Sequence, residues 1–191
     1  AGRIRIASAN LLELDDRALA AFRNRHIGFV FQFNNLLSDF TVIENVALPL
    51  IIDGYSRKES IKRAKDLLSQ VGLSNRAGNY PNQVSAGEQQ RVAIARALIN
   101  NPKIVIADEI TGNLDEETAD SIFDFFLNEI KKNKQSLIYV THNEKYAKKA
   151  MYFLLSLCKR GTEGVFFHLP SNLILCFLKS ISFALVHSPL S

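Results

Sequence analysis

The sequence predicts an α/β domain with a mostly parallel sheet and a small helical subdomain. Short apolar runs at 27–31, 104–107 and 137–140 have the length and composition of buried strands. Stretches with apolar residues at helical spacing separate these runs along the chain. Because strands that alternate with helices form parallel sheets, we expect these strands to lie side by side with helices on both faces.

The N-terminal elements are a short strand at 3–6, a helix at 15–25 and a strand at 27–32. From residue 34 to residue 78 the pattern becomes helical. Thr41 and Glu44 have the spacing of a capping box, in which each side chain bonds the other residue's backbone amide. Ser56 and Glu59 repeat that spacing, and Gly72 is a plausible helix end.

A third capping box, Ser85 with Glu88, opens a helix that runs to Leu98. The strand at 104–107 ends in Asp108 and Glu109, and the strand at 137–140 ends before His142. Ligands of parallel sheets bind off the carboxyl ends of the strands, where these three residues fall. By itself, however, an Asp-Glu pair at a strand end is also typical of a solvated loop.

The predicted domain organisation has four parts. Residues 1–33 form part of the core, 34–84 a helical subdomain, 85–150 the rest of the core and 151–191 a tail of different composition. The tail's apolar run at 173–178 is interrupted by Lys179 and is too short for a membrane helix. The chain begins without Met, so we expect its N-terminus to be cut.

The net charge of +4 is mild, and the basic residues are scattered rather than clustered. Nucleic-acid binding usually needs a basic stripe, so no nucleic-acid partner is predicted.

Ser85, Ala86 and Gly87 present a hydroxyl and backbone amides at the positive end of a helix, which suits a phosphate group. An ordinary capped helix would explain Ser85 and Glu88 alone, but not the acidic strand end that follows.

Several motifs occur in the order found in ABC ATPases, over residues 3–150. The run 84–98 resembles the ABC signature motif and its helix, 104–109 the Walker B strand, 112–115 the D-loop, Thr141-His142 the switch histidine and Phe31-Gln32 the Q-loop. The runs 32–37, 41–46 and 111–115 most resemble the lipoprotein-releasing (Lol-type) and macrolide-exporter group. This resemblance implies a P-loop NTPase core, ATP and Mg²⁺ as cofactors, and the role of an ATPase subunit at the cytoplasmic face of the inner membrane.

The resemblance also implies the roles of single residues. Glu109 would be the general base, Asp108 would hold the water shell of Mg²⁺, and Gln32 would contact Mg²⁺ or the attacking water. His142 would bond the γ-phosphate, and Asp115 would communicate across a dimer. The residues expected to bind the ATP of a second ATPase subunit are Ser85, Ala86, Gly87 and Glu88. Transmembrane permease subunits are the expected membrane partners.

The sequence departs from the family pattern in two groups of features. Ala86 stands where Gly is usual, Glu88 where Gln is commonest, and Ile110 where Pro is usual. If the backbone at Ala86 needs positive φ, the methyl costs about 1 kcal/mol. The 191 residues also contain no Gly followed by Lys, and therefore no Walker A loop.

We therefore expect this chain not to hydrolyse ATP at a normal rate. The alternative interpretation is an inactive truncated or frameshifted remnant of such a subunit. A DNA-repair ATPase would also use a signature helix, but it requires long coiled-coil heptads, which the sequence lacks.

Overall fold

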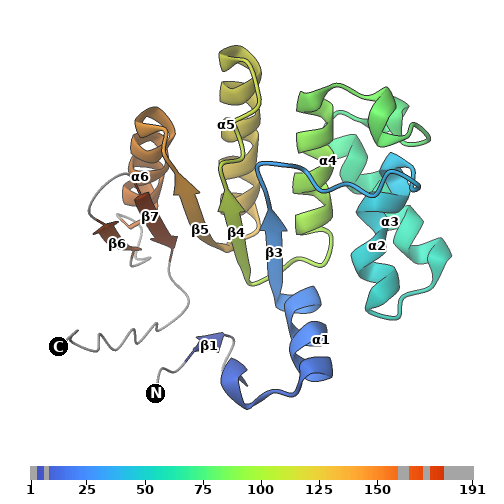
Figure 1. Ribbon diagram of the computed structural model, residues 1–191, viewed down its shortest axis with the longest axis horizontal. Helices are drawn as coiled ribbons and strands as arrows, with labels where there is room; N and C mark the ends of the chain where they lie inside the picture. The colour runs from blue at the N-terminus through green and yellow to red at the C-terminus, as the bar shows by residue number, and fades with distance from the viewer. Residues whose placement is uncertain (1–3, 7–8, 159–163, 170–172, 179–191) are drawn as a thin grey trace.

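A five-stranded sheet forms the centre of the computed structural model, which describes residues 4–6, 9–158, 164–169 and 173–178 (Figure 1). The strand order is β3-β4-β5-β7-β6. The strands are β3 (Ile27–Val30), β4 (Ile104–Asp108), β5 (Ser136–Thr141), β6 (Gly164–Leu169) and β7 (Leu173–Leu178). The first three are parallel, with Val30 opposite Ala107 and Ala107 opposite Tyr139.

The other edge of the sheet is antiparallel. β7 pairs with β5, Val140 lying opposite Leu175, and β6 pairs with β7. Between β5 and these strands, α6 (Glu144–Cys158) runs past Ala150 without a break. The boundary predicted near residue 150 thus falls inside a helix. Of the predicted tail at 151–191, the structure describes only the end of α6 and these two strands.

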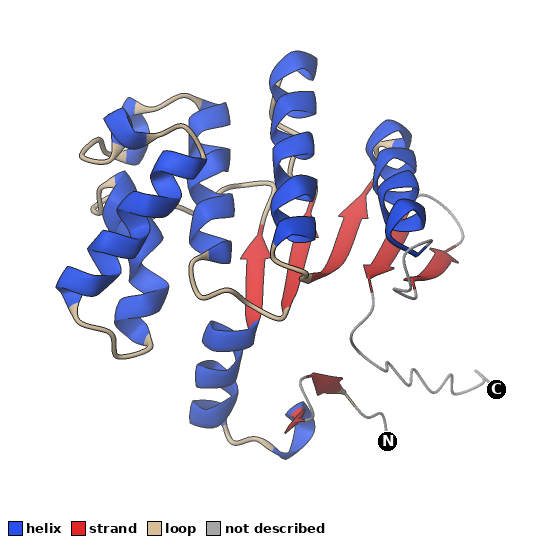
Figure 2. Ribbon diagram, turned by 180° about the vertical axis from the view of Figure 1, so that it is seen from behind, coloured by secondary structure: helices blue, strands red, loops and turns tan. Residues whose placement is uncertain are grey.

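Helices cover one face of the sheet. α4 (Ala86–Leu98), α5 (Glu116–Lys132) and α6 lie in front of the strands in Figure 2. Burial alternates along β3 and β5: Val30, Leu137 and Tyr139 are buried, whereas Phe29 and Ile138 are only half-buried. The prediction of helices on both faces is therefore wrong for the described residues, because apolar strand composition does not say what covers each face.

Side chains of α4, α5 and the three parallel strands form the main hydrophobic core. The apolar face of α5 is buried there; its members are Ile122, Phe123, Phe126, Leu127 and Ile130. α4 lies close to β3 because Gly28 has no side chain: a Cβ at that position would collide with the backbone oxygen of Ala97.

A second core lies in the helical subdomain, between α2 (Val42–Ile52) and α3 (Arg57–Gln70), with 3-10 turns at Ser74–Arg76 and Pro81–Gln83. Both capping-box bonds between Thr41 and Glu44 are present, as predicted. At Ser56 only the hydroxyl's bond from the Glu59 amide forms, at 3.2 Å, because Glu59 pairs with Arg63 instead. Gly72 follows α3 with φ +74, a left-handed conformation that favours glycine.

The N-terminal segment begins with a two-stranded antiparallel sheet, β1 (Arg5–Ile6) with β2 (Ala9–Asn10). A 3-10 turn at Leu11–Glu13 and α1 (Asp16–His26) follow. Asp15 caps α1 by accepting a hydrogen bond of 2.7 Å from the Ala18 amide. The predicted strand at 27–32 ends at Val30, so Gln32 lies in a loop.

Candidate functional site

Glu109 lies at the turn that follows β4, and its side chain is bonded to the end of β5. Its carboxylate accepts a hydrogen bond from the His142 backbone N–H and another, of 3.2 Å, from the Thr141 hydroxyl. The Glu109 N–H in turn donates to the backbone oxygen of Val140 at 3.0 Å. Three bonds therefore fix Glu109 against the neighbouring strand.

The backbone of Glu109 is left-handed, with φ +45. This conformation costs a residue other than glycine about 1–3 kcal/mol and persists where the surroundings enforce it. Here the next residue of the turn, Ile110, is buried in the main core and anchors the turn. The turn that aims Glu109 is thus held by packing at the position where the family usually has Pro.

Thr141 also has a second polar contact. Its hydroxyl oxygen accepts a hydrogen bond of 3.0 Å from the Asn143 N–H, which leaves the hydroxyl proton to Glu109. Beneath it, Tyr139 is fully buried and stacks at a tilt on Phe123 with ring centroids 5.3 Å apart. Burial raises the pKa of Tyr139 above its usual value, so this ring stays neutral.

Gln32 lies against the loop that follows Glu109. The Asn113 side-chain amide donates to the backbone oxygen of Gln32 at 3.2 Å. Gly112 leaves room for the Gln32 side chain, because a Cβ there would lie 2.8 Å from its Nε2 atom. Gln32, Glu109 and the 111–115 loop therefore form one contiguous group at the ends of the parallel strands.

Asp115 caps α5. Its Oδ1 atom accepts a hydrogen bond of 2.9 Å from the Thr118 N–H, and that bond lowers the pKa of the Asp115 carboxyl. Asp115 is exposed, and it is held at the helix end by this contact.

The N-terminus of α4 carries a complete capping box. Ser85 Oγ accepts from the Glu88 N–H at 3.2 Å, and the Ser85 N–H donates to the Glu88 carboxylate at 2.9 Å. The Ser85 amide is the main cause of a lowered pKa for Glu88, and Arg76, at 3.0 Å, contributes further. The helix therefore presents a carboxylate that a neighbouring guanidinium neutralises.

Ala86 and Gly87, the first two residues of α4, differ in surroundings. Ala86 is exposed and is not among the described residues with positive φ, so its methyl causes no backbone strain. Gly87 is buried, and a Cβ there would lie 2.7 Å from Cγ2 of Thr118. The glycine thus lets α4 and α5 approach each other, in addition to leaving its amide unhindered.

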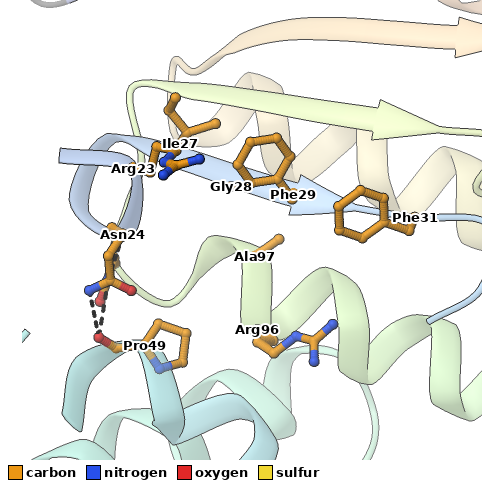
Figure 3. Close-up of a pocket in the computed structure, with 10 residues that line it drawn as sticks. Arg23, Asn24, Ile27, Gly28, Phe29, Phe31, Pro49, Arg96 and Ala97 are labelled. Carbon is orange, nitrogen blue, oxygen red and sulfur yellow. Dashed lines mark hydrogen bonds between the residues drawn. The ribbon is translucent and has the colours of Figure 1, made fainter. Parts of the chain in front are cut away.

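A cavity of about 260 Å³ opens between β3 and the helices α1, α2 and α4 (Figure 3). Its lining is mostly apolar, with two arginines, and comprises Arg23, Asn24, Ile27, Gly28, Phe29, Phe31, Pro49, Arg96, Ala97 and Asn100. On one side, Asn24 donates to the Pro49 carbonyl at 2.9 Å, which joins α1 to α2.

The strand ends and the α4 N-terminus suit a magnesium nucleotide. Asp108 is an exposed carboxylate that ends β4. In the described part of the chain no three His, Cys, Asp or Glu side chains cluster as a metal site. Mg²⁺ usually takes one or two carboxylates together with phosphate oxygens, so these residues fit an ion that arrives with its nucleotide.

The structure places the residues predicted from sequence in three locations. One set gathers at the ends of β3, β4 and β5 and comprises Gln32, Asp108, Glu109 and His142. A second set, Ser85, Ala86, Gly87 and Glu88, lies at the start of α4, and Asp115 caps α5. Sequence reasoning missed the bond of Thr141 to the Glu109 carboxylate, the bonds of Asn45 within 37–41, and those of Arg96 to the backbone oxygens at 34–35. Their residue types carry no signal for such contacts, which depend on how the elements pack.

Comparison with known proteins shows the family to which the chain is related. The ABC transporter family model matches residues 1–112. The chain is 51% identical over 146 residues to the lipoprotein-releasing system ATP-binding protein LolD of Cytophaga hutchinsonii, covering 76% of this chain and 67% of that protein. The LolD of Geobacter metallireducens is 49% identical, with 76% and 65% covered.

Solved structures give the same result. The dimeric structure of MJ0796, a bacterial ABC transporter cassette, matches with a TM-score of 0.68 and 41% identity over 78% of this chain and 66% of that chain. The MJ0796 dimer in a post-hydrolysis state with ADP and Pi matches with a TM-score of 0.67 and 40% identity, covering 76% and 65%.

The fold is that of an ATPase cassette. The chain belongs to the ABC transporter family. It spans about two thirds of the length of the relatives and cassettes described above. No helix in the described ranges has both the length and the apolar character needed to cross a membrane.

Proposed function

We propose that this chain is the ATP-binding and ATP-hydrolysing part of an ABC transporter subunit of the lipoprotein-releasing type. One observation carries the proposal: Glu109 and His142 meet at adjacent strand ends, and Gln32 contacts the loop that follows Glu109. LolD relatives at 49–51% identity support the type of transporter.

In this proposal the strand-end group performs the hydrolysis. Asp108 holds the water shell of Mg²⁺, and Glu109 accepts a proton from the attacking water as general base. Gln32 positions that water or contacts the metal, and His142 bonds the γ-phosphate. Mg²⁺, when bound, neutralises charge on the phosphates.

The first turn of α4 serves a second ATPase subunit. Ser85, Ala86, Gly87 and Glu88 would bind the terminal phosphate of ATP held by that subunit, because a helix N-terminus offers amides and a positive dipole end. The Arg76–Glu88 pair removes the charge conflict that a lone Glu88 would create there. Asp115 would communicate across the same interface, and the dimeric MJ0796 cassette supports this arrangement.

The membrane partners would be permease subunits, docked where Phe33 is 70% exposed and where the cavity of Figure 3 opens. Leu37 and Phe40 are exposed on the same loop. Exposed aromatic and aliphatic side chains of this size are typical of protein interfaces. The subunit would then lie peripherally at the cytoplasmic face of the inner membrane.

ATP also needs a P-loop, and the 191 residues contain no Gly followed by Lys. We therefore expect the 191-residue chain alone to show no ATP turnover above background.

The experiment uses the full-length subunit with its permease partners in lipid nanodiscs. ATP hydrolysis and ATP-dependent release of a lipidated protein are measured together. Glu109→Gln should lower kcat by about 100-fold or more, because it removes the general base. Glu117→Gln, at an exposed position on α5, is the matched control and should retain activity.

Failure of the intact complex to release the lipidated protein would contradict the transporter type. Turnover by the 191-residue chain alone that disappears with Glu109→Gln would contradict the need for the missing loop.

A further inference from the structure

Arg96 lies in the last turn of the signature helix α4, yet its guanidinium reaches the loop that follows Gln32. Nη1 donates to the backbone oxygen of Asn35 and Nη2 to that of Asn34, both at 2.7 Å. More than 60 residues separate the two partners in sequence. These are short, charge-assisted bonds to two successive carbonyls, a geometry that suits the planar fork of a guanidinium.

Arg96 has no carboxylate partner in any ion pair of the described residues. It is half-buried, and this burial lowers its pKa from the ordinary value. Desolvating an arginine without an acid is unfavourable unless its hydrogen bonds are made, so the two carbonyls are what keeps the side chain in place. Figure 3 shows Arg96 extending from α4 on the side of the cavity where Phe31 lies.

The loop itself adopts a conformation that needs such support. Asn35 has φ +47, a left-handed backbone for a residue other than glycine. Farther along, the Asn45 side chain bonds Leu37, Phe40 and Thr41, which fixes the end of the loop to α2. Arg96 holds the first half of the loop in the same way, but it fixes the loop to α4.

We infer that Arg96 is a positioning residue that makes the loop of residues 33–37 move together with the signature helix. Ser85 at one end of α4 and Arg96 near the other are separated by about 16 Å of continuous helix. A displacement of the first turn, where the partner's ATP would bind, is therefore carried to the exposed loop at Phe33. The functional meaning of this link rests on the proposed role as a transporter ATPase.

The test measures the link in the 191-residue chain without nucleotide or partner, so its outcome does not depend on the proposed function. Amide hydrogen exchange is followed for residues 33–37 and for α5. Arg96→Met removes both donors but keeps an apolar stem, and Arg96→Lys keeps one charged donor. Arg91→Met, on the same helix with an exposed bond of 3.0 Å to Ser121, is the matched control.

Arg96→Met should speed exchange at 33–37 by about tenfold or more while leaving α5 unchanged, since two charge-assisted bonds are lost. Arg96→Lys should restore part of the protection, and Arg91→Met should change nothing in the loop. As a second readout, Phe33→Trp supplies the chain's single tryptophan, whose quenching by acrylamide should rise with Arg96→Met.

Unchanged exchange at 33–37 in Arg96→Met would overturn the inference. Equal acceleration in α5 and the loop would overturn it as well, because it would show a general loss of stability. If Arg96→Met does not fold, Arg96→Lys is compared with the native chain. Faster exchange confined to residues 33–37 then supports the inference, and unchanged exchange there overturns it.

Discussion

The backbone N–H of His142 donates a hydrogen bond to the carboxylate of Glu109, across 33 residues of sequence. The adjacent Thr141 hydroxyl engages the second carboxylate oxygen at 3.2 Å. Both oxygens of the proposed base are thus occupied by the end of β5. The parallel register of β4 with β5 brings Glu109 close to Thr141 and His142, because Asp108 lies opposite Val140.

Removing the acceptor should therefore free the His142 amide. Glu109→Ala is expected to speed hydrogen exchange of that amide by about tenfold, because a bond to a charged acceptor contributes about 1.5–3 kcal/mol. Glu109→Gln keeps an acceptor oxygen and should retain most of the protection. Equal exchange rates in the Ala variant and the native chain, measured by NMR, would contradict the contact.

Because α4 packs closely on α5 at Gly87, we expect any side chain at this position to lower the free energy of unfolding. Gly87→Ala should lower the free energy of unfolding by about 1–3 kcal/mol, since the new methyl would overlap Thr118 Cγ2. Thr118→Ser removes that atom, so the double variant should be more stable than the sum of the two single changes. Urea denaturation of all four proteins measures the coupling, and strict additivity would refute it.

Asn45 should be among the most sensitive polar positions. It is fully buried, and it accepts from the Leu37 N–H at 2.8 Å while its amide group bonds three carbonyls. Asn45→Ala leaves these groups unpaired, and we expect a loss of about 2–4 kcal/mol in thermal or urea unfolding. Asn113→Ala, which removes one exposed bond, is the control and should cost far less.

Stability should fall in acid partly through the capping boxes. The pKa of Glu88 is lowered chiefly by the Ser85 amide, and that of Glu44 by the Thr41 hydroxyl and amide. A carboxyl whose pKa is lower in the folded state stabilises the fold at pH above its unfolded-state pKa, near 4.5. This stability is lost as the pH falls through the folded-state pKa. The loss should therefore begin near the unfolded value and continue below it.

Glu88→Gln should flatten this acid limb of the stability profile, measured by urea unfolding between neutral and acidic pH. Arg76→Met should flatten it less, because the Ser85 amide is a larger cause than the guanidinium. An acid limb that is the same in Glu88→Gln and the native chain would show that the capping box does not titrate.

Local features of the fold were predictable from sequence. Thr41 and Ser85 were expected at the starts of helices, and each accepts the expected backbone hydrogen bond. The runs at 104–107 and 137–140 were expected as strands and are β4 and most of β5. Such signals work because a cap depends on residues three positions apart, and a buried strand on a short continuous run of apolar residues.

Contacts between distant elements were not predictable in the same way. The sequence indicated that Glu109 and His142 lie at strand ends, but only the sheet register joins them. It marked Gly87 as part of a phosphate-binding turn, and the structure shows it packed against Thr118. It likewise gave no sign that β7 would pair antiparallel with β5.

The sequence by itself therefore determined the family motifs, the helix starts and the strands that carry the site. Only the tertiary structure decided that helices cover one sheet face, that Glu109 is bonded to β5, and that Arg96 holds the loop after Gln32. The physical reason is the separation along the sequence over which each interaction acts. Caps and apolar periodicity act within a few residues, whereas these contacts join segments more than 30 residues apart and exist only once the sheet and helices have packed.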